Sequence, residues 1–277
     1  MSLTTKYSKT STKLAIGDTY NVYYQPPISL SSHGKGLVPR KRAPKKKVTE
    51  ERQMWFDADE SFTPALVKKD RNCFYISGQS GAGKSHLAAQ LMATYHKKYP
   101  DNHIFIIQPR DIPDPAFKEV YKFKKLDGEP CCIVIPIDSI PEALASGMTY
   151  SYDDFASSCV CFDDFQSVKD LESRAYLEGM KKEFLELGRK NKITVICTTH
   201  HLADGKKTYD MIHESNGIVV FPLKAGGNEL GFFKSHMKMS QDEIDEIMNL
   251  PSYGARWVFI GNEPIRYVLW SHGAYLL

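Results

Sequence analysis

The chain has 277 residues, of which 42% are hydrophobic and 25% are charged, a balance typical of a globular rather than a disordered protein. No apolar run approaches the roughly 18 residues of a membrane-spanning helix, and residues 1–7 lack the apolar core of a secretory signal. We therefore expect an intracellular protein with one large α/β domain and extensions, or two small domains.

The net charge of +3 is unevenly distributed. Residues 1–50 hold ten Lys/Arg and two Asp/Glu, whereas residues 51–277 hold 26 Lys/Arg and 31 Asp/Glu. The first 50 residues show little periodicity, so we expect a basic, flexible arm there and a folded domain over residues 51–277. The arm could contact nucleic-acid phosphates, act as a localisation signal or remain solvated. Its aromatic run at residues 20–27 could dock on this chain or on a neighbour.

A glycine-rich segment lies between a strand-like apolar run at residues 72–77 and a helix-like run at residues 85–95. It fits the phosphate-binding pattern G-x-x-x-x-G-K-S/T at every defined position, and its flanks are those that the pattern requires. The segment consists of Gly78, Gln79, Ser80, Gly81, Ala82, Gly83, Lys84 and Ser85.

The residue types in this segment suit the binding of a nucleotide's phosphates. Glycines allow positive φ and a close approach to an anion, so that backbone N–H groups can point at phosphate oxygens. Lys84 would reach the β- and γ-phosphates, and the Ser85 hydroxyl would bind Mg²⁺. A glycine turn that merely caps a helix is the alternative, which the complete match disfavours.

Two further strands are expected before the middle of the chain, at residues 103–107 and 131–135, and the place of the second in the sheet stays open. A third apolar run, at residues 158–162, ends in Asp163 and Asp164. This pattern is typical of a central parallel strand that delivers carboxylates to the carboxyl edge of a sheet. Beside a phosphate loop, Asp163 is expected to bind Mg²⁺ and Asp164 to orient the attacking water; without one, such a pair is more often a solvated turn.

The spacing predicts a long helix over residues 168–190, with one apolar face formed by Tyr176, Met180, Phe184 and Leu187. A buried strand follows at residues 193–197 and ends in the polar residues 198–201. Adjacent histidines rarely converge on one metal, so a γ-phosphate sensor or a plain polar loop is favoured over a zinc site.

The last third predicts more sheet, at residues 217–221, 256–261 and 265–270. A helix is expected to begin after Ser240, because Ser240 and Glu243 have the spacing of a capping box.

Several of these segments resemble a known superfamily. The strand order resembles the additional-strand class of P-loop ATPases, and residues 185–200 look like the helix, arginine, strand and sensor segment of the FtsK/HerA superfamily of DNA-pumping ATPases. Residues 214–222 and 256–269 resemble the genome-packaging ATPases of large double-stranded DNA viruses, the poxvirus type. The resemblance covers roughly residues 70–277 and leaves out residues 1–50.

The resemblance implies an α/β fold with a mainly parallel, RecA/FtsK-HerA-like sheet flanked by helices. It also implies a sensor at Thr199 and His200, and Arg189 as an arginine finger for the ATP of the next subunit. A cation at a helix C-terminus is favourable in itself, which is the other explanation of Arg189. The chain departs from many relatives in having Asp164 where they have Glu, and His200 where they have Gln.

The function that the resemblance implies is ATP-driven translocation of double-stranded DNA into a capsid. It implies a homo-oligomeric ring that contacts capsid or other virion proteins, in the cytoplasm or viral factory of an infected cell or with the virion. The alternatives are a helicase or loader, and a non-catalytic virion protein that retains a nucleotide site. Candidate DNA-gripping residues, otherwise ordinary solvated lysines, are Lys122, Lys124, Lys125, Lys206 and Lys207.

Overall fold

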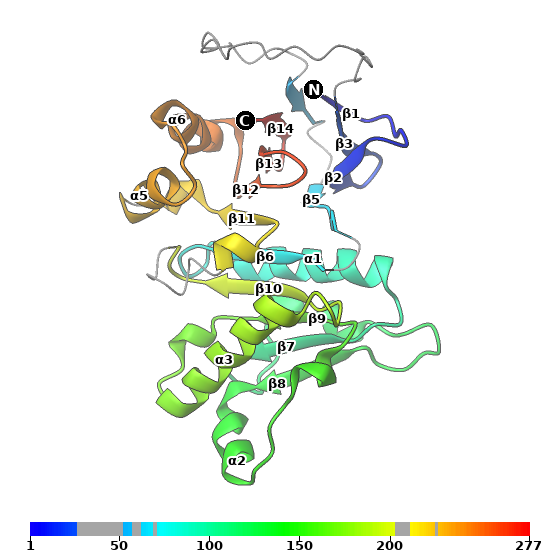
Figure 1. Cartoon of the computed structure of the whole chain (residues 1–277), viewed down its shortest axis with the longest axis vertical. Coiled ribbons are helices and arrows are strands. Elements are labelled where there is room, and N and C mark those ends of the chain that lie inside the picture. The colour runs from blue at the N-terminus through cyan, green and yellow to red at the C-terminus, as the bar shows by residue number, and fades with distance from the viewer. Residues whose placement is uncertain (27–51, 57–61, 69–70, 203–210, 225–226) are drawn as a thin grey trace, which may run out of the picture.

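The structure, a computed structural model, describes residues 1–26, 52–56, 62–68, 71–202, 211–224 and 227–277. Within these residues the strands form a ten-stranded sheet and a separate four-stranded sheet, and helices lie against the large sheet (Figure 1). No helix of the described residues is long and apolar enough to cross a membrane.

Six neighbouring strands of the large sheet run parallel. Every residue in five of them is buried, as expected for strands covered on both faces. In sheet order the six are β11 (Gly217–Val220), β6 (Cys73–Ser77), β10 (Thr194–Thr199), β9 (Cys159–Phe162), β7 (Ile104–Gln108) and β8 (Cys132–Pro136).

The strand order confirms the predicted fold class. β10 follows β9 in the chain but lies between β9 and β6, so one strand separates the strand before the phosphate loop from the strand before Asp163. The strand with no predicted place, β8, is found at the edge of the sheet, where its Ile133 is 38% exposed.

The remainder of the large sheet is antiparallel and includes two strands that the sequence did not predict, β14 and β4. The antiparallel strands are β12 (Val258–Gly261), β13 (Tyr267–Trp270), β14 (Gly273–Leu276) and β4 (Gln53–Trp55). Because β12 runs against β11, the residues before β12 lie at the same edge of the sheet as the end of β11.

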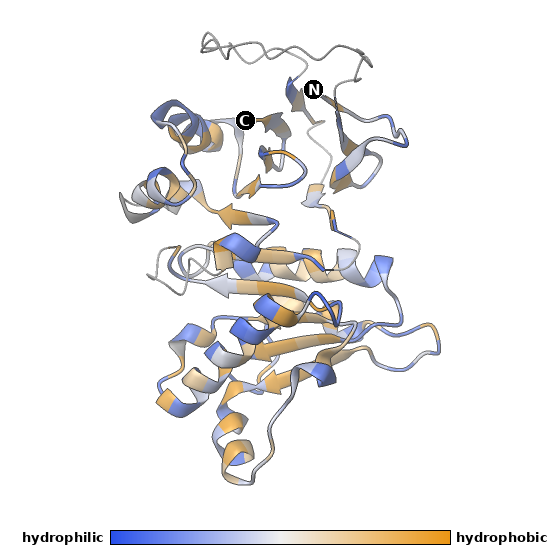
Figure 2. Cartoon of the chain, in the orientation of Figure 1, coloured by the Kyte–Doolittle hydropathy of each residue, from blue (hydrophilic) through white to orange (hydrophobic). Residues whose placement is uncertain are grey.

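Helices cover both faces of the sheet. Side chains of β6 alternate between two hydrophobic cores: one contains Tyr75 with residues of α3 (Leu171–Leu187), and the other contains Phe74 with residues of α1 (Lys84–Lys98). Apolar residues concentrate in the parallel strands, whereas the helices carry both apolar and polar residues (Figure 2). The other α-helices are α2 (Ile140–Ala145), α5 (Gly227–Ser235) and α6 (Gln241–Asn249).

Short 3₁₀ helices connect many of these elements. They are η2 (Pro115–Phe117), η3 (Val120–Lys122), η4 (Ile137–Ser139), η5 (Tyr152–Phe155), η6 (Phe165–Ser167), η7 (Pro222–Lys224) and η8 (Leu250–Tyr253). The predicted capping box at the start of α6 is present, since Ser240 and Glu243 exchange backbone and side-chain hydrogen bonds.

The predicted apolar face of the long helix needs one correction. Met180 and Phe184 are buried as expected, but Leu187 is 40% exposed and Leu177 is fully buried in its place. Leu177, Met180 and Phe184 follow the spacing i, i+3, i+7 of one helix face. The helix is also shorter than predicted, because it begins after the N-cap Asp170 and ends at Leu187.

The expectation of a flexible arm is wrong for residues 2–25. They form β1 (Ser2–Thr4), β2 (Thr12–Gly17) and β3 (Asn21–Gln25), which pair antiparallel with β5 (Phe62–Pro64) in the order β1-β3-β2-β5. Leu14 and Val22 are fully buried in the same core as α1. These strands are short and polar in composition, so their few apolar residues give little periodicity.

The aromatic run that begins at Tyr20 docks on the chain itself. The ring of Tyr20 lies 5.3 Å from the ring of Phe62, in an edge-to-face arrangement. The basic cluster of residues 35–47 lies outside the described residues. The division at residue 50 into an arm and a domain stays a prediction.

Candidate nucleotide-binding site

The glycine-rich segment forms the turn between β6 and α1 at the carboxyl edge of the sheet. Gly81 and Gly83 have positive φ values of 70° and 108°, which glycine adopts without steric cost. Gly83 is the N-cap residue of α1, and no side chain caps the first turn. The N–H groups at this helix start therefore form the kind of concave surface that binds anions.

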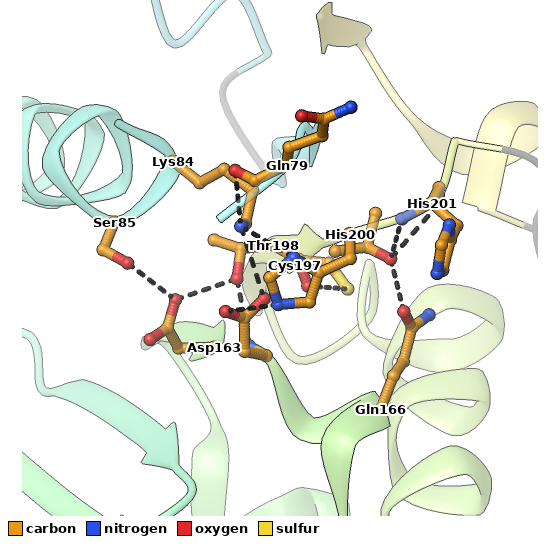
Figure 3. A network of polar contacts seen from close by, with 11 residues as sticks. Gln79, Lys84, Ser85, Asp163, Gln166, Cys197, Thr198, His200 and His201 are labelled. Carbon is orange, nitrogen blue, oxygen red and sulfur yellow. Dashed lines mark hydrogen bonds and ion pairs between the residues drawn. The ribbon is translucent and has the colours of Figure 1, made fainter. Parts of the chain in front are cut away.

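Two neighbouring strands, β9 and β10, bring Asp163 and Thr198 to Ser85 of α1 beside this turn (Figure 3). Asp163 directly follows β9 and is 5% exposed. Its Oδ1 accepts hydrogen bonds from Ser85 Oγ at 3.3 Å and from Thr198 Oγ1 at 2.8 Å. Burial raises the pKa of the Asp163 carboxyl to about 6, although the bond from Thr198 lowers it. The charge of Asp164 adds to the increase.

Ser85 and Asp163 have the chemistry of a Mg²⁺ site. Mg²⁺ prefers oxygen ligands and is usually bound by one or two carboxylates together with phosphates and water. A buried carboxylate with a raised pKa lacks a compensating positive charge, which a cation would supply. These residues therefore fit the metal that was predicted for them.

The neighbouring Asp164 faces the phosphate-loop lysine rather than Ser85. One of its oxygens lies 3.8 Å from Lys84 Nζ and the other 3.1 Å from His200 Nε2. Lys84, which is 5% exposed, also lies 3.4 Å from His200 Nδ1 and 3.5 Å from the carbonyl oxygen of Gln79. Because the lysine donates to Nδ1, the imidazole proton belongs on Nε2, where it is donated to Asp164.

These contacts place the two acids in different chemical environments. Asp163 lies among hydroxyl groups, whereas Asp164 lies beside an ammonium group and an imidazole. Asp164 also adopts a left-handed backbone conformation with a φ of 46°, which aspartate tolerates better than most residues. That turn directs its backbone N–H to Thr198 Oγ1 at 3.0 Å.

The predicted sensor residues are separated in the structure. His200 reaches Lys84 and Asp164, but Thr199 donates to Gln166 Oε1 and lies near the backbone of His201. The hydroxyl that contacts both acids belongs to Thr198, which the sequence analysis did not select. The strict alternation of side chains along a strand is the signal that separates Thr198 from Thr199.

Arg189 lies at the opposite edge of the sheet. It is exposed and follows α3, and the N–H of Ile193 bonds to the carbonyl of Gly188 just before β10 begins. The six residues of β10 separate this turn from the phosphate loop by about 20 Å at a rise of about 3.3 Å per residue. Arg189 therefore does not reach the site of its own chain.

Three of the five candidate DNA-gripping lysines make contacts within the described residues. Lys125 Nζ lies 2.8 Å from Nε2 of His103, just before β7 begins, and Lys122 forms an ion pair of 2.8 Å with Glu119. The backbone of Lys124 forms an isolated antiparallel β-bridge with that of Pro130. Lys206 and Lys207 lie outside the described residues.

Residues 45–221 match the family model described as type III restriction enzyme, res subunit (ResIII). A protein of Sputnik virophage named "Uncharacterized protein V3" is 27% identical over 215 residues, which cover 77% of this chain and 80% of that protein.

The fold is also similar to several solved structures. The genome packaging NTPase B204 from Sulfolobus turreted icosahedral virus 2, in complex with sulfate, has a TM-score of 0.48 and 14% identity, with 75% of this chain and 97% of that chain covered. The DNA-packaging ATPase B204 from Sulfolobus turreted icosahedral virus has a TM-score of 0.48 and 18% identity, with coverage of 71% and 96%. Because the ResIII model matches more than half of the residues, this chain belongs to the ResIII family.

Proposed function

We propose that this chain is an ATPase that drives double-stranded DNA into a viral capsid. The observation that carries the proposal is the position of Lys84 and Ser85 on one side, and Asp163 and Asp164 on the other, of a single site at the carboxyl edge of the sheet. Such a site can bind a triphosphate and a metal and can direct water at the terminal phosphate.

Each part of the site has a role in this proposal. The N–H groups of the phosphate loop and the ammonium of Lys84 would bind the phosphates. Ser85 and Asp163 would hold Mg²⁺, which neutralises phosphate charge when it is bound. Asp164 would accept a hydrogen bond from the attacking water, while His200 keeps its carboxylate in place at 3.1 Å.

The nucleic-acid part of the proposal has two supports. The ResIII description names a restriction-enzyme subunit, a class of protein that works on nucleic acid, and the virophage relative is a viral protein. The narrower assignment to DNA packaging depends on the resemblance of residues 185–200, 214–222 and 256–269 to FtsK/HerA-type packaging ATPases. A ring of subunits would allow Arg189 of one copy to reach the nucleotide of the next.

Another nucleic-acid ATPase, such as a helicase or loader, is the second candidate, and the ResIII family favours it specifically. The two functions differ in the form of DNA that the protein would bind. A packaging motor must grip intact duplex of any sequence through its phosphates, whereas a helicase needs a single-stranded region or a fork.

Phosphate release by the full chain with ATP and Mg²⁺ tests the proposal when it is measured without DNA and with blunt duplex, forked and single-stranded DNA. We expect blunt duplex to stimulate release most. Stimulation only by forked or single-stranded DNA would favour the helicase or loader. Nucleotide binding without release, even with DNA and capsid protein, would indicate a non-catalytic virion protein.

The control for this experiment is Lys84→Ala, with its fold checked by circular dichroism. We expect no turnover from a folded variant. Normal turnover by Lys84→Ala would show that the phosphate loop is not the active site.

A further inference from the structure

A groove of about 480 Å³ opens beside the phosphate loop, on the side away from the two acids. The sheet order explains this position, because β6 has β10 and β9 on one side and β11 and β12 on the other (Figure 1). Phe221 directly follows β11, and Arg256 and Trp257 directly precede the antiparallel β12. All three therefore reach the carboxyl edge next to Gly83 and line the groove.

The site chemistry sets the direction in which a nucleotide would lie. Asp163, Asp164 and His200 all come from β9 and β10, so a terminal phosphate and its metal belong on that side of the loop. The other end of the phosphate chain then leaves the loop away from the acids. The groove begins there, at Gly83, and continues past His86 on the first turn of α1.

The groove has the composition that suits a nucleoside. Phe221 and Trp257 are buried to 5% and 9% exposure and provide an apolar wall, while His86 and Ser271 add polar groups. The volume lies within the range of about 300–1,000 Å³ found for small-molecule sites, which combine apolar walls with a few polar groups.

Arg256 is placed to cover this groove. Its side chain is exposed, and a Cβ on Gly83 would lie 3.8 Å from both Nε and Nη2 of its guanidinium. A guanidinium is planar and stacks on flat aromatic groups, including nucleobases. No ion pair or hydrogen bond of this guanidinium is found among the described residues.

We propose that this groove binds the nucleoside half of the nucleotide and that Arg256 stacks on its base. This inference depends on the proposed ATP site at the phosphate loop. It separates the contributions of the two halves of the ligand: the loop holds phosphates, and the groove holds the base and ribose.

The test compares the binding of ADP and of pyrophosphate to the full chain by calorimetry. We expect Arg256→Ala to weaken ADP binding about fivefold or more and to leave pyrophosphate binding unchanged, because base stacking is typically worth a factor of about 5 to 150. Arg256→Lys should weaken ADP binding as well, since it keeps the charge but loses the planar group. The control is Arg174→Ala, which removes a surface ion pair with Glu178 on α3.

The possible outcomes separate this inference from the proposed function. Unchanged ADP binding in Arg256→Ala would overturn the inference alone. Equal weakening of ADP and pyrophosphate, or full ADP affinity in Arg256→Lys, would show that the charge acts on phosphate and would also overturn it. Failure of the wild-type chain to bind either ligand would overturn the proposed function itself.

Discussion

Thr198 Oγ1 donates a hydrogen bond of 2.8 Å to Asp163 Oδ1. The same hydroxyl accepts the backbone N–H of Asp164 at 3.0 Å, so one side chain of β10 holds both acids at the end of β9. This contact exists only because β10 is inserted between β6 and β9. The additional strand thus positions the acids as well as extending the sheet.

Replacement of Thr198 by valine, which has nearly the same shape but no hydroxyl, should lower ATP turnover about 10- to 100-fold. Losses of this size are usual when a group that orients a metal ligand is removed. The measurement is the turnover rate as a function of Mg²⁺ concentration, and the requirement for Mg²⁺ should rise. Thr94→Val is the control, because Thr94 only bonds back to Gln90 within α1. Wild-type Mg²⁺ dependence in Thr198→Val would contradict the role assigned to this hydroxyl.

The raised pKa of Asp163 predicts a pH-dependent stability of the nucleotide-free protein. Its carboxyl has a pKa of about 6 in the folded chain against an ordinary value of 3.8, so the folded state binds more protons between these values. Stability should therefore fall as pH rises from about 4 to about 6, by about 3 kcal/mol at most.

Comparison with Asp163→Asn isolates this contribution, because the amide oxygen can still accept bonds from Ser85 and Thr198 but does not ionise. The variant should be more stable than the wild-type chain at pH 7 and similar to it near pH 4. Urea unfolding of both proteins over this pH range measures the difference. A constant difference at all pH values would show that the burial of this carboxylate is not what destabilises the wild-type chain.

The sequence was sufficient to predict the parts of the site that lie close together in the chain. The segment from Gly78 to Ser85 and the acids at the end of β9 are each local patterns in which residue type and flanking periodicity agree. Thr198 was missed because its selection over Thr199 depends on the register in which β10 pairs with β9, and that pairing is a long-range property. The N-terminal strands were missed because they are short, and because the pairing of β2 with β5 joins segments about 45 residues apart.

Asp164→Asn should separate nucleotide binding from turnover. The Asp164 carboxylate lies 3.8 Å from Lys84 Nζ, so it competes with phosphate for the ammonium. Its neutralisation should leave ADP affinity unchanged or higher, while turnover should fall about 10²-fold or more because the water loses its acceptor. Calorimetry and phosphate release measure the two effects. Lys84→Ala provides the contrast, since it should lose both ADP binding and turnover. An equal loss of ADP binding and turnover in Asp164→Asn would argue against this division of roles.

Arg189→Ala tests whether the next subunit completes the site. Arg189 is exposed about 20 Å from the phosphate loop of its own chain, so its loss should leave ADP binding unchanged. If it serves a neighbouring nucleotide, turnover should fall about 10³-fold or more. Lys190→Ala, an exposed cation at the next position, should have little effect.

Mixing two inactive variants distinguishes a role between subunits from a role within one. In a ring of Arg189→Ala and Lys84→Ala subunits, some sites combine the intact phosphate loop of the first variant with the intact arginine of the second. Phosphate release should therefore return when the two are mixed, although neither releases phosphate alone. Recovery would require contact between copies, because each chain by itself lacks one of the two groups. Absence of recovery in mixed oligomers would mean that Arg189 supports the fold of its own chain, where a cation beside the end of α3 is favourable in any case.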